Sequence, residues 1–264
     1  MEGLYPPGSV TRRINREQAM LLGGGRALLM QLAHPGVAAA VDEHSDFEVD
    51  PLRRLNRTLE LTLSMVFGTR QEALAAVRTI NRTHRAVRGR GYHALDPELL
   101  LWVHATLVDS GLLTYRTFVG ELSLAEAEAF YQESKPAGEL LGIPLHLYPA
   151  DLRDFRGYLQ RMLEGGPLRV DARARRLAGL VLRPRLRLVP GFAFVPFEVV
   201  TAGLLPAGLR RDYGLAWGGA QRAAFALARA VVPRLVRVTP PALRLVPAAR
   251  RTQLRLDTEV RHGS

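Results

Sequence analysis

The stretch DPELLLWVHATLVDSGLLTYRTF, residues 96–118, decides the fold class. Asp96 can cap the N-terminus of a helix, and Pro97 suits the first helical turn, where no backbone N–H is needed. The apolar residues that follow recur three and four positions apart, which is the period of a helix. The stretch therefore predicts a long apolar helix that ends near Phe118.

The same period recurs along the rest of the chain, and no run of alternating strands is found. We therefore expect an all-α fold. Ser123 and Glu126 form a capping box at the start of a further helix, and Gly68 is an expected stop for an earlier one. The expected helices span about 15–33, 36–44, 51–67, 71–87, 96–118, 123–133, 151–163, 170–180, 194–204, 206–213, 217–233 and 240–258.

The length and the distribution of prolines indicate how the chain is organised. A chain of 264 residues with 47% hydrophobic residues can supply a sizeable core. No flexible linker divides it, so we expect residues 1–264 to form a single multi-helix domain. The C-terminal helices, residues 184–258, are rich in Arg, Leu and Pro and would pack on the preceding part.

Composition excludes several classes of site. The chain has no cysteine, which excludes disulfides, iron–sulfur clusters, zinc–thiolate sites and thiolate-ligated haem. The net charge of +11 would ordinarily indicate nucleic acid as a partner. However, Lys135 is the single lysine, and an excess of arginine alone is more typical of a coding bias than of phosphate recognition. We expect no nucleic-acid partner.

Hydropathy gives an expectation for location. The N-terminus lacks the charged start and apolar stretch of a secretory signal. No window of about 18 residues is free of charge, so we expect no transmembrane segment. The sequence favours a cytoplasmic protein, and its basic C-terminal helices leave peripheral membrane contact open.

One polar motif lies within the expected helices. Arg54, Arg57 and Thr58 are three and four residues apart, so they share one helix face and can point into one cavity. His84 follows about one long helix later. A cationic, hydroxyl-bearing face near an imidazole can hold a haem, whereas three polar residues at this spacing are more commonly a solvated face.

Two other histidines and a run of glycines have competing interpretations. His104 lies on a very apolar helix, which is typical of a core histidine bonded to a carbonyl or carboxylate. His34 precedes Pro35 at a helix end, which favours capping or packing. Both remain candidate cofactor-binding residues. The glycines at 23–25 lack the lysine and hydroxyl of a phosphate-binding loop, so they favour close helix packing.

Several segments together resemble one known family, the MpaB oxygenases and the rubber-cleaving latex clearing proteins. The resemblance is strongest over residues 10–165. The matching segments are LLGGGRALLMQLAHP (21–35), HS (44–45), RxxRT (54–58), VFG (66–68), HRAV (84–87) and DPELLLWVHATL (96–107).

The resemblance implies an all-helical fold with a globin-like core around haem b, whose iron is held by a helical histidine. His84 matches that histidine. Characterised members use dioxygen to cleave carbon–carbon double bonds of isoprenoid chains, so dioxygen and a small apolar substrate are the implied partners. Arg54 and Thr58 match the family's Arg-x-x-Lys-Thr motif, but Arg57 replaces the lysine. A guanidinium stays protonated and is a poor iron ligand.

The resemblance and the side-chain chemistry together suggest roles. Arg54 or Arg57 would pair with a haem propionate or steer dioxygen, and Thr58 would donate a hydrogen bond to it. The family's proposed catalytic glutamate has no residue-for-residue match, because the spacing of Glu43, the nearest candidate, differs. Apolar positions would cover the porphyrin: Leu59, Leu63, Val103 and Leu107.

A second interpretation belongs to a different class. The replaced lysine and the unmatched glutamate both favour a non-catalytic helical protein that binds haem, a lipid or an isoprenoid. An absorbance spectrum separates a haem from an empty apolar pocket.

Overall fold

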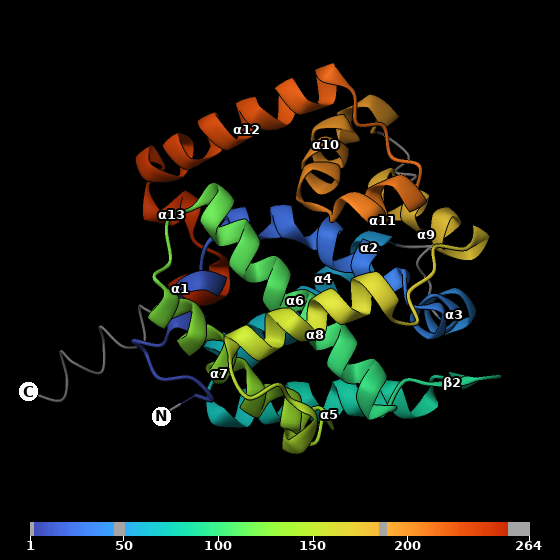
Figure 1. Ribbon diagram of the computed structural model, residues 1–264. Coiled ribbons are helices and arrows are strands. Elements are labelled where there is room, and N and C mark those ends of the chain that lie inside the picture. Colours follow the sequence, from blue (N-terminus) through green and yellow to red (C-terminus); the bar gives the residue numbers. More distant parts are fainter. Residues whose placement is uncertain (1–2, 45–50, 185–188, 253–264) are drawn as a thin grey trace, which may run out of the picture.

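The computed structural model describes residues 3–44, 51–184 and 189–252, except for the side chains of residues 51, 52 and 54. It has the expected all-α fold (Figure 1). Within the described residues, the strands β1 (Arg88–Gly89) and β2 (Tyr92–His93) pair antiparallel. The helices are α1 (Val10–Asn15), η1 (Gln18–Gly23), α2 (Gly24–Leu32), α3 (Pro35–His44), α4 (Pro51–Phe67), α5 (Arg70–Ala86), α6 (Pro97–Phe118), α7 (Leu124–Leu140), η2 (Leu145–Leu147), α8 (Leu152–Gly165), α9 (Ala172–Leu182), η3 (Gly191–Phe194), α10 (Val195–Leu204), α11 (Ala207–Asp212), α12 (Gly219–Val238) and α13 (Pro241–Arg244).

Helix α6 runs through the middle of the molecule, in green in Figure 1. The Asp96 carboxylate caps it by accepting hydrogen bonds from the backbone N–H groups of Glu98 and Leu99, at 2.9 and 3.3 Å. Trp102 on this helix is fully buried in an apolar cluster to which α1, α2, α7, α8 and α9 also contribute. The expected long apolar helix is confirmed, and the main core is built around it.

The glycines at 23–25 lie where η1 meets α2. A Cβ atom on Gly23 would overlap the Thr114 hydroxyl of α6, and one on Gly25 would overlap the Thr201 hydroxyl of α10. Only a residue without a side chain lets these backbones approach so closely. Close helix packing at the glycine run is therefore confirmed.

Arg26 follows the glycines and joins the same helices. Its guanidinium is buried and donates to the Asp109 carboxylate at 2.5 Å, to the Ser110 hydroxyl at 2.7 Å and to the Leu204 carbonyl at 2.9 Å. Because a buried cation needs a partner, this network fixes α2 against α6 and α10. Arg26 is thus a structural residue of the helix junction.

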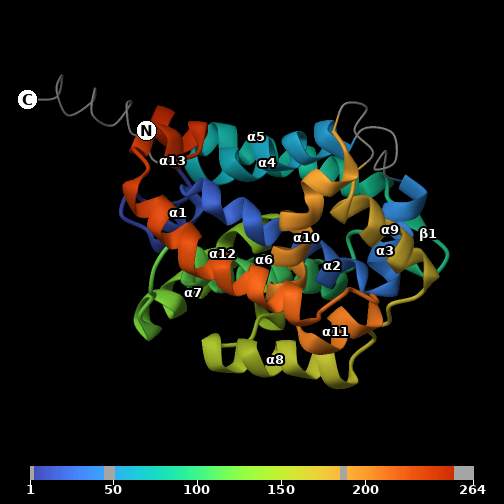
Figure 2. The same cartoon turned by 90° about the horizontal axis from the view of Figure 1, so that it is seen from above.

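Helices α4 and α5 form an antiparallel hairpin, seen side by side in Figure 2. Thr69 starts α5 with a capping box: its hydroxyl accepts from the Glu72 N–H at 3.3 Å, and the Glu72 carboxylate accepts from the Thr69 N–H at 2.8 Å. Near the turn, Met65 of α4 and Val77 of α5 are buried in a second apolar cluster with Tyr5. This cluster holds the turn end of the hairpin.

The C-terminal helices cover one side of α6. Val200 and Leu204 of α10 are buried against Phe118, and Phe225 and Val232 of α12 pack on them. In the part of the chain that the structure describes, no helix combines the length and apolar character needed to cross a bilayer.

The expected helix over residues 15–33 is wrong. Helix α1 ends at Asn15, the 3-10 helix η1 follows, and α2 begins at Gly24. The chain extends at Glu17, whose buried carboxylate pairs with Arg16 and Arg244 at 3.2 and 3.1 Å. The long-range pair with Arg244 is a tertiary contact that overrides the helical period of the local sequence.

Two helices run beyond their expected ends. Helix α7 continues through Pro136 to Leu140, and α12 continues through Pro233 to Val238. Proline removes one helical hydrogen bond, and packing compensates for that loss in α7, where the next residue, Ala137, is buried in the second cluster. A single helix over 240–258 is wrong: α13 ends at Arg244, the chain is extended at Leu245, and helix resumes at 247, while the residues after 252 lie outside the described chain.

Candidate functional site

His84 lies on the inward face of α5. Ala73, Val77, Ile80 and His84 follow one another at spacings of four, three and four, so they form one stripe along the helix. Ala73 and Val77 are buried, and Ile80 packs against the second apolar cluster. The imidazole therefore continues a buried stripe, one turn beyond its last apolar residue.

The imidazole of His84 has a buried nitrogen without a partner. Its Nδ1 atom makes no hydrogen bond with any described residue. Burial lowers the pKa of His84, so the ring is neutral at pH 7. Neutral imidazole is the form that coordinates iron. An unsatisfied buried polar atom costs about 1–3 kcal/mol, which a bound group that completes its interactions would recover.

The arginine–threonine motif lies in the first half of α4, where the helix is least buried. Arg57 and Thr58 are exposed, and Leu55 is 47% exposed. Toward the turn, Met65 is buried. The backbone of Arg54 belongs to α4, but its side chain lies outside the described part of the structure. Among the described residues, this half of α4 is thus more exposed than its second half.

The hairpin brings the motif and the histidine to the same end. Each arm has 17 residues, so the start of α4 lies level with the end of α5. Arg54, in the first turn of α4, is therefore level with His84, in the last turn of α5. Thr58 lies about one turn nearer the hairpin turn. We call this region, away from the turn, the far end of the hairpin.

His104 has its own partners on another side of α6. Its Nε2 atom lies 3.2 Å from the Ser134 hydroxyl of α7, and its ring packs edge-on to Tyr148 with centroids 5.7 Å apart. Burial lowers the pKa of His104 to about 4. It is a neutral core histidine, as its apolar helix predicts, although its partner is a hydroxyl instead of a carbonyl or carboxylate.

His34 lies at the junction of α2 and α3. Its Nδ1 atom accepts a hydrogen bond from the Gly36 N–H at 3.2 Å. Burial lowers its pKa, and the nearby Asp96 carboxylate partly opposes that effect. The capping interpretation therefore accounts for His34. Its assignment as a cofactor-binding residue stays a prediction, as does that of His104.

An exposed leucine interrupts the buried surface of α6. Leu107 is 52% exposed, whereas its neighbours Thr106 and Val108 are buried. Val103, one turn earlier on the same side of the helix, is partly buried. A single exposed leucine is common on protein surfaces and does not by itself mark a binding site.

Two neighbouring interactions carry no obvious sequence signal. The Asn81 side chain donates to the Leu140 carbonyl of α7 at 3.0 Å, which anchors the last turns of α5 just before His84. Asn81 lies three residues before His84, on the same side of the helix, and this spacing is the one sequence pattern that could have indicated its position near the histidine. The Tyr92 hydroxyl donates to Glu43 at 2.6 Å, and burial and this bond raise the pKa of Tyr92 to about 12.

The donor types at the far end of the hairpin fit a haem. Among the described residues, no three His, Asp or Glu side chains are grouped to hold a metal ion by themselves. A haem iron needs only one protein ligand on its proximal side, which His84 can supply. Arg57, which is exposed on α4, can pair with a haem propionate.

Comparisons with known proteins point to one family. The family model described as "ER-bound oxygenase mpaB/B'/Rubber oxygenase, catalytic domain" matches residues 11–234. Uncharacterized proteins of Mycobacterium bovis and Mycobacterium tuberculosis are each 31% identical over 217 residues, which cover 75% of this chain and 81% of theirs. No solved structure gives a significant match.

The matched region contains the helices that build the site. It includes α4 and α5 with the motif and His84, and it also includes α6. An all-α fold and a match over most of the chain agree with the resemblance of the sequence motifs. The chain belongs to the family of the ER-bound oxygenase MpaB and rubber oxygenase catalytic domains.

Proposed function

We propose that this protein is a haem b-dependent oxygenase acting on a small or medium apolar substrate of the isoprenoid or alkene type. Family membership supports the oxygenase class. The observation that carries the haem assignment is the buried Nδ1 atom of His84, which bonds to no described residue, on the inward face of α5. His84 is the proposed axial ligand and the only proposed metal ligand.

Haem, when bound, would supply the activation of dioxygen and the electron transfer. The chain would hold and orient it. His84 is neutral and lies on a helix that the Asn81 hydrogen bond anchors to α7, so the backbone that carries the ring is held in place before binding. Arg57 would neutralise a propionate at the solvent edge.

The remaining motif residues would act on dioxygen and substrate. Thr58 carries a hydroxyl that can donate a hydrogen bond to dioxygen, and Arg54, one turn away on the same face, would steer dioxygen or bind the second propionate. Leu55 and Leu107 present apolar surface that suits an alkene chain and excludes water.

A non-catalytic role in binding haem, a lipid or an isoprenoid is the alternative. Arg57 stands where the family motif has lysine, and an arginine stays protonated. Glu43, the nearest candidate for a catalytic base, is engaged by the Tyr92 hydroxyl and lies 3.7 Å from Arg173. Both features favour binding without turnover.

A haem titration tests the proposal. Purified protein titrated with haemin should develop a Soret band at one equivalent, and His84→Ala should lose it while its circular dichroism stays helical. Added imidazole should restore the band in His84→Ala by replacing the missing ligand. His146→Ala is the matched control because His146 is exposed on η2. Full haem occupancy in His84→Ala would overturn the assignment.

A second measurement separates enzyme from carrier. The haem-loaded protein is incubated with a polyisoprenoid alkene under dioxygen, and both dioxygen uptake and carbonyl products are measured. Uptake with matching product supports the oxygenase. A normal Soret band without dioxygen uptake and without carbonyl products favours the non-catalytic binding role.

A further inference from the structure

Helix α12 is an unusual surface helix. Twenty residues long, it is described throughout, and none of its residues is buried. Its sequence, GAQRAAFALARAVVPRLVRV, contains no acidic residue and four arginines. A helix that is apolar and cationic at once, with no acid to balance it, is typical of contact with an anionic surface.

The exposed side of α12 carries an apolar stripe. Leu227, Val231, Leu235 and Val238 follow one another at spacings of four, four and three, so they share one face. Leu227 is 64% exposed and Val238 76% exposed. Another exposed leucine, Leu243, continues the apolar surface onto α13. The helix packs on α10 through different residues, so in the described part of the chain the stripe lies outside that contact.

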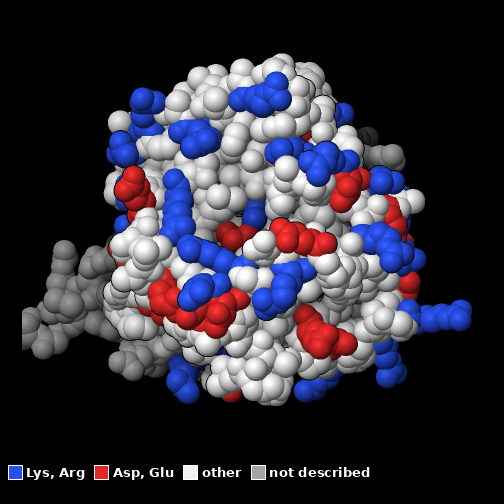
Figure 3. Space-filling model, in the orientation of Figure 1, with Lys and Arg blue, Asp and Glu red and all other residues white. Residues whose placement is uncertain are grey.

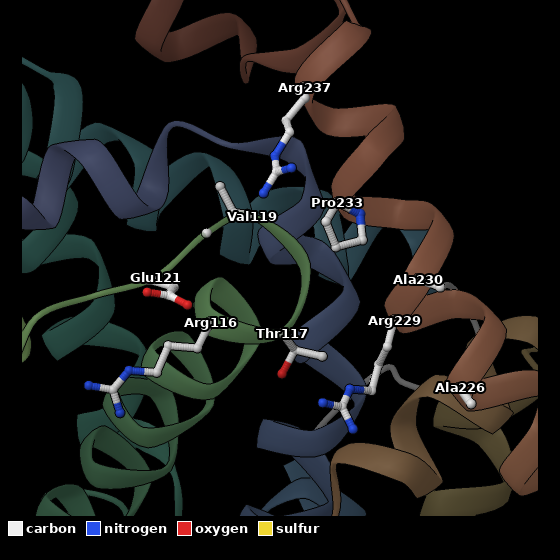
Figure 4. Close-up of a pocket in the computed structure, with 10 residues that line it drawn as sticks. Arg116, Thr117, Val119, Glu121, Ala226, Arg229, Ala230, Pro233 and Arg237 are labelled. Atoms are coloured by element: carbon white, nitrogen blue, oxygen red, sulfur yellow. The ribbon is translucent and has the colours of Figure 1, made fainter.

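A cleft borders the same helix on its other flank. It has a volume of about 710 Å³ and lies between the end of α6 and α12. Figure 4 shows the guanidinium groups of Arg229 and Arg237 extending from α12 toward the end of α6, where Thr117 and Glu121 form the other wall. Three arginines line this cleft, Arg116, Arg229 and Arg237, and Glu121 is its one carboxylate. The excess of positive charge around an open cleft suits a phosphate group.

The arginines of α12 are available for an external anion. Among the residues that the structure describes, none of Arg222, Arg229, Arg234 and Arg237 pairs with a carboxylate. Over α12, at the top of Figure 3, the surface shows blue and white atoms with little red. Unpaired cations beside exposed leucines favour a partner that offers both negative charge and an apolar layer.

We propose that α12, with Leu243 of α13, docks this protein on an anionic phospholipid membrane. The apolar stripe enters the boundary between headgroups and acyl chains, the arginines bind lipid phosphates, and the cleft holds one headgroup. The helix lies in the plane of the membrane surface. This inference does not depend on haem binding, because its residues lie outside the far end of the hairpin.

Vesicle co-sedimentation tests the docking. The full chain is mixed with vesicles of phosphatidylglycerol and phosphatidylcholine, or of phosphatidylcholine alone. Binding should require the anionic lipid and weaken as salt is raised, because salt screens exposed charges. Arg229→Gln with Arg237→Gln should lower the partition coefficient roughly tenfold or more. Leu227→Ser with Leu235→Ser should lower it to a similar extent.

Matched controls separate the surface from general charge and hydrophobicity. Arg153→Gln with Arg156→Gln removes the same charge from exposed positions of α8, and Leu124→Ser removes an exposed leucine of α7. Both controls should bind vesicles as the wild type does. Millimolar inorganic phosphate should not displace the protein, because free phosphate lacks the apolar layer.

Three results would overturn the docking proposal. One is equal binding by the α12 variants and the controls. Another is equal binding to neutral and anionic vesicles. The third is a dimer, seen by light scattering, that Leu227→Ser with Leu235→Ser converts to a monomer without changing vesicle binding, since the stripe would then join two copies of the chain.

Discussion

His84 and His104 show how two helical histidines with similar burial differ in what they can bind. Burial lowers the pKa of both, so both rings are neutral at pH 7. The Nε2 atom of His104 is bonded to Ser134, which leaves its ring committed to the core. His84 has no such bond among the described residues. The difference in partners, not the pKa direction, distinguishes the candidate ligand.

The pKa of His104 predicts a pH-dependent stability. It falls from the usual 6.5 to about 4. Between these values the unfolded chain binds a proton at this site and the folded chain does not, so the free energy of unfolding decreases as pH falls. The expected decrease from this site is up to about 1.4 kcal/mol per pH unit, levelling off below pH 4.

Urea unfolding of the wild type and of His104→Gln across this pH window checks the prediction. The variant cannot titrate, so its stability should fall less steeply with acid. His146→Gln, at an exposed position, should keep the wild-type slope. Equal slopes for all three proteins would mean that His104 is protonated in the folded state.

At the residue scale, the sequence predicts which side chains share a helix face better than it predicts how deeply each side chain is buried. The spacing placed Arg54, Arg57 and Thr58 on one face of a helix and His84 on the next helix, but not at the same end of a hairpin. The exposure of Arg57 and Thr58 agrees with the solvated face that such a spacing more commonly forms. The sequence could not predict that Nδ1 of His84 bonds to no described residue, because that depends on tertiary packing. The roles of these residues stay predictions.

The junction of α1, η1 and α2 illustrates the limits at the element scale. Capping signals predicted the starts of α6 and α7 correctly, because a cap is a local hydrogen bond. The break at Glu17 was missed, because its cause is an ion pair with Arg244, far along the chain. The helix propensity of the local sequence cannot predict a contact with a residue so distant in the chain.

The same junction gives a stability prediction. A methyl group on Gly25 would meet Thr201 and Phe197 of α10, and turning the Thr201 side chain brings its methyl into the same space. Gly25→Ala should therefore lower the free energy of unfolding by about 1–3 kcal/mol. At Gly24 a Cβ meets nothing within 4 Å. Gly24→Ala should be neutral or stabilise by up to about 1 kcal/mol.

Chemical denaturation of both variants measures this difference. The two substitutions add the same methyl group at adjacent positions, so a change in the unfolded state affects them similarly. Equal stabilities would show that α2 and α10 separate easily, and that the glycines serve another purpose.

On the scale of the whole molecule, the main core and the candidate site lie in different places. The main core surrounds Trp102, and the second cluster holds the hairpin near its turn. Among the described residues, no member of either cluster lies at the far end of the hairpin. Within the described residues, the first half of α4 is more exposed than its second half, and a ligand that covered it would add burial energy. That the chain is a single domain with a globin-like core remains a prediction.

A porphyrin should therefore act as part of the fold. A ligand that binds only the folded state stabilises it by about 2.7 kcal/mol at a free concentration one hundred times its Kd. For a chain of this length each kcal/mol raises Tm by roughly 2–4 °C, so haemin should raise Tm by about 5–10 °C.

Iron-free protoporphyrin has the same apolar faces and propionates but cannot bind an imidazole through iron. It should raise Tm less in the wild type. In His84→Ala the two compounds should give the same smaller shift, because only the apolar contacts and propionate pairs remain. If haemin and protoporphyrin shift the wild type equally, the far end of the hairpin is an apolar slot and His84 does not ligate iron.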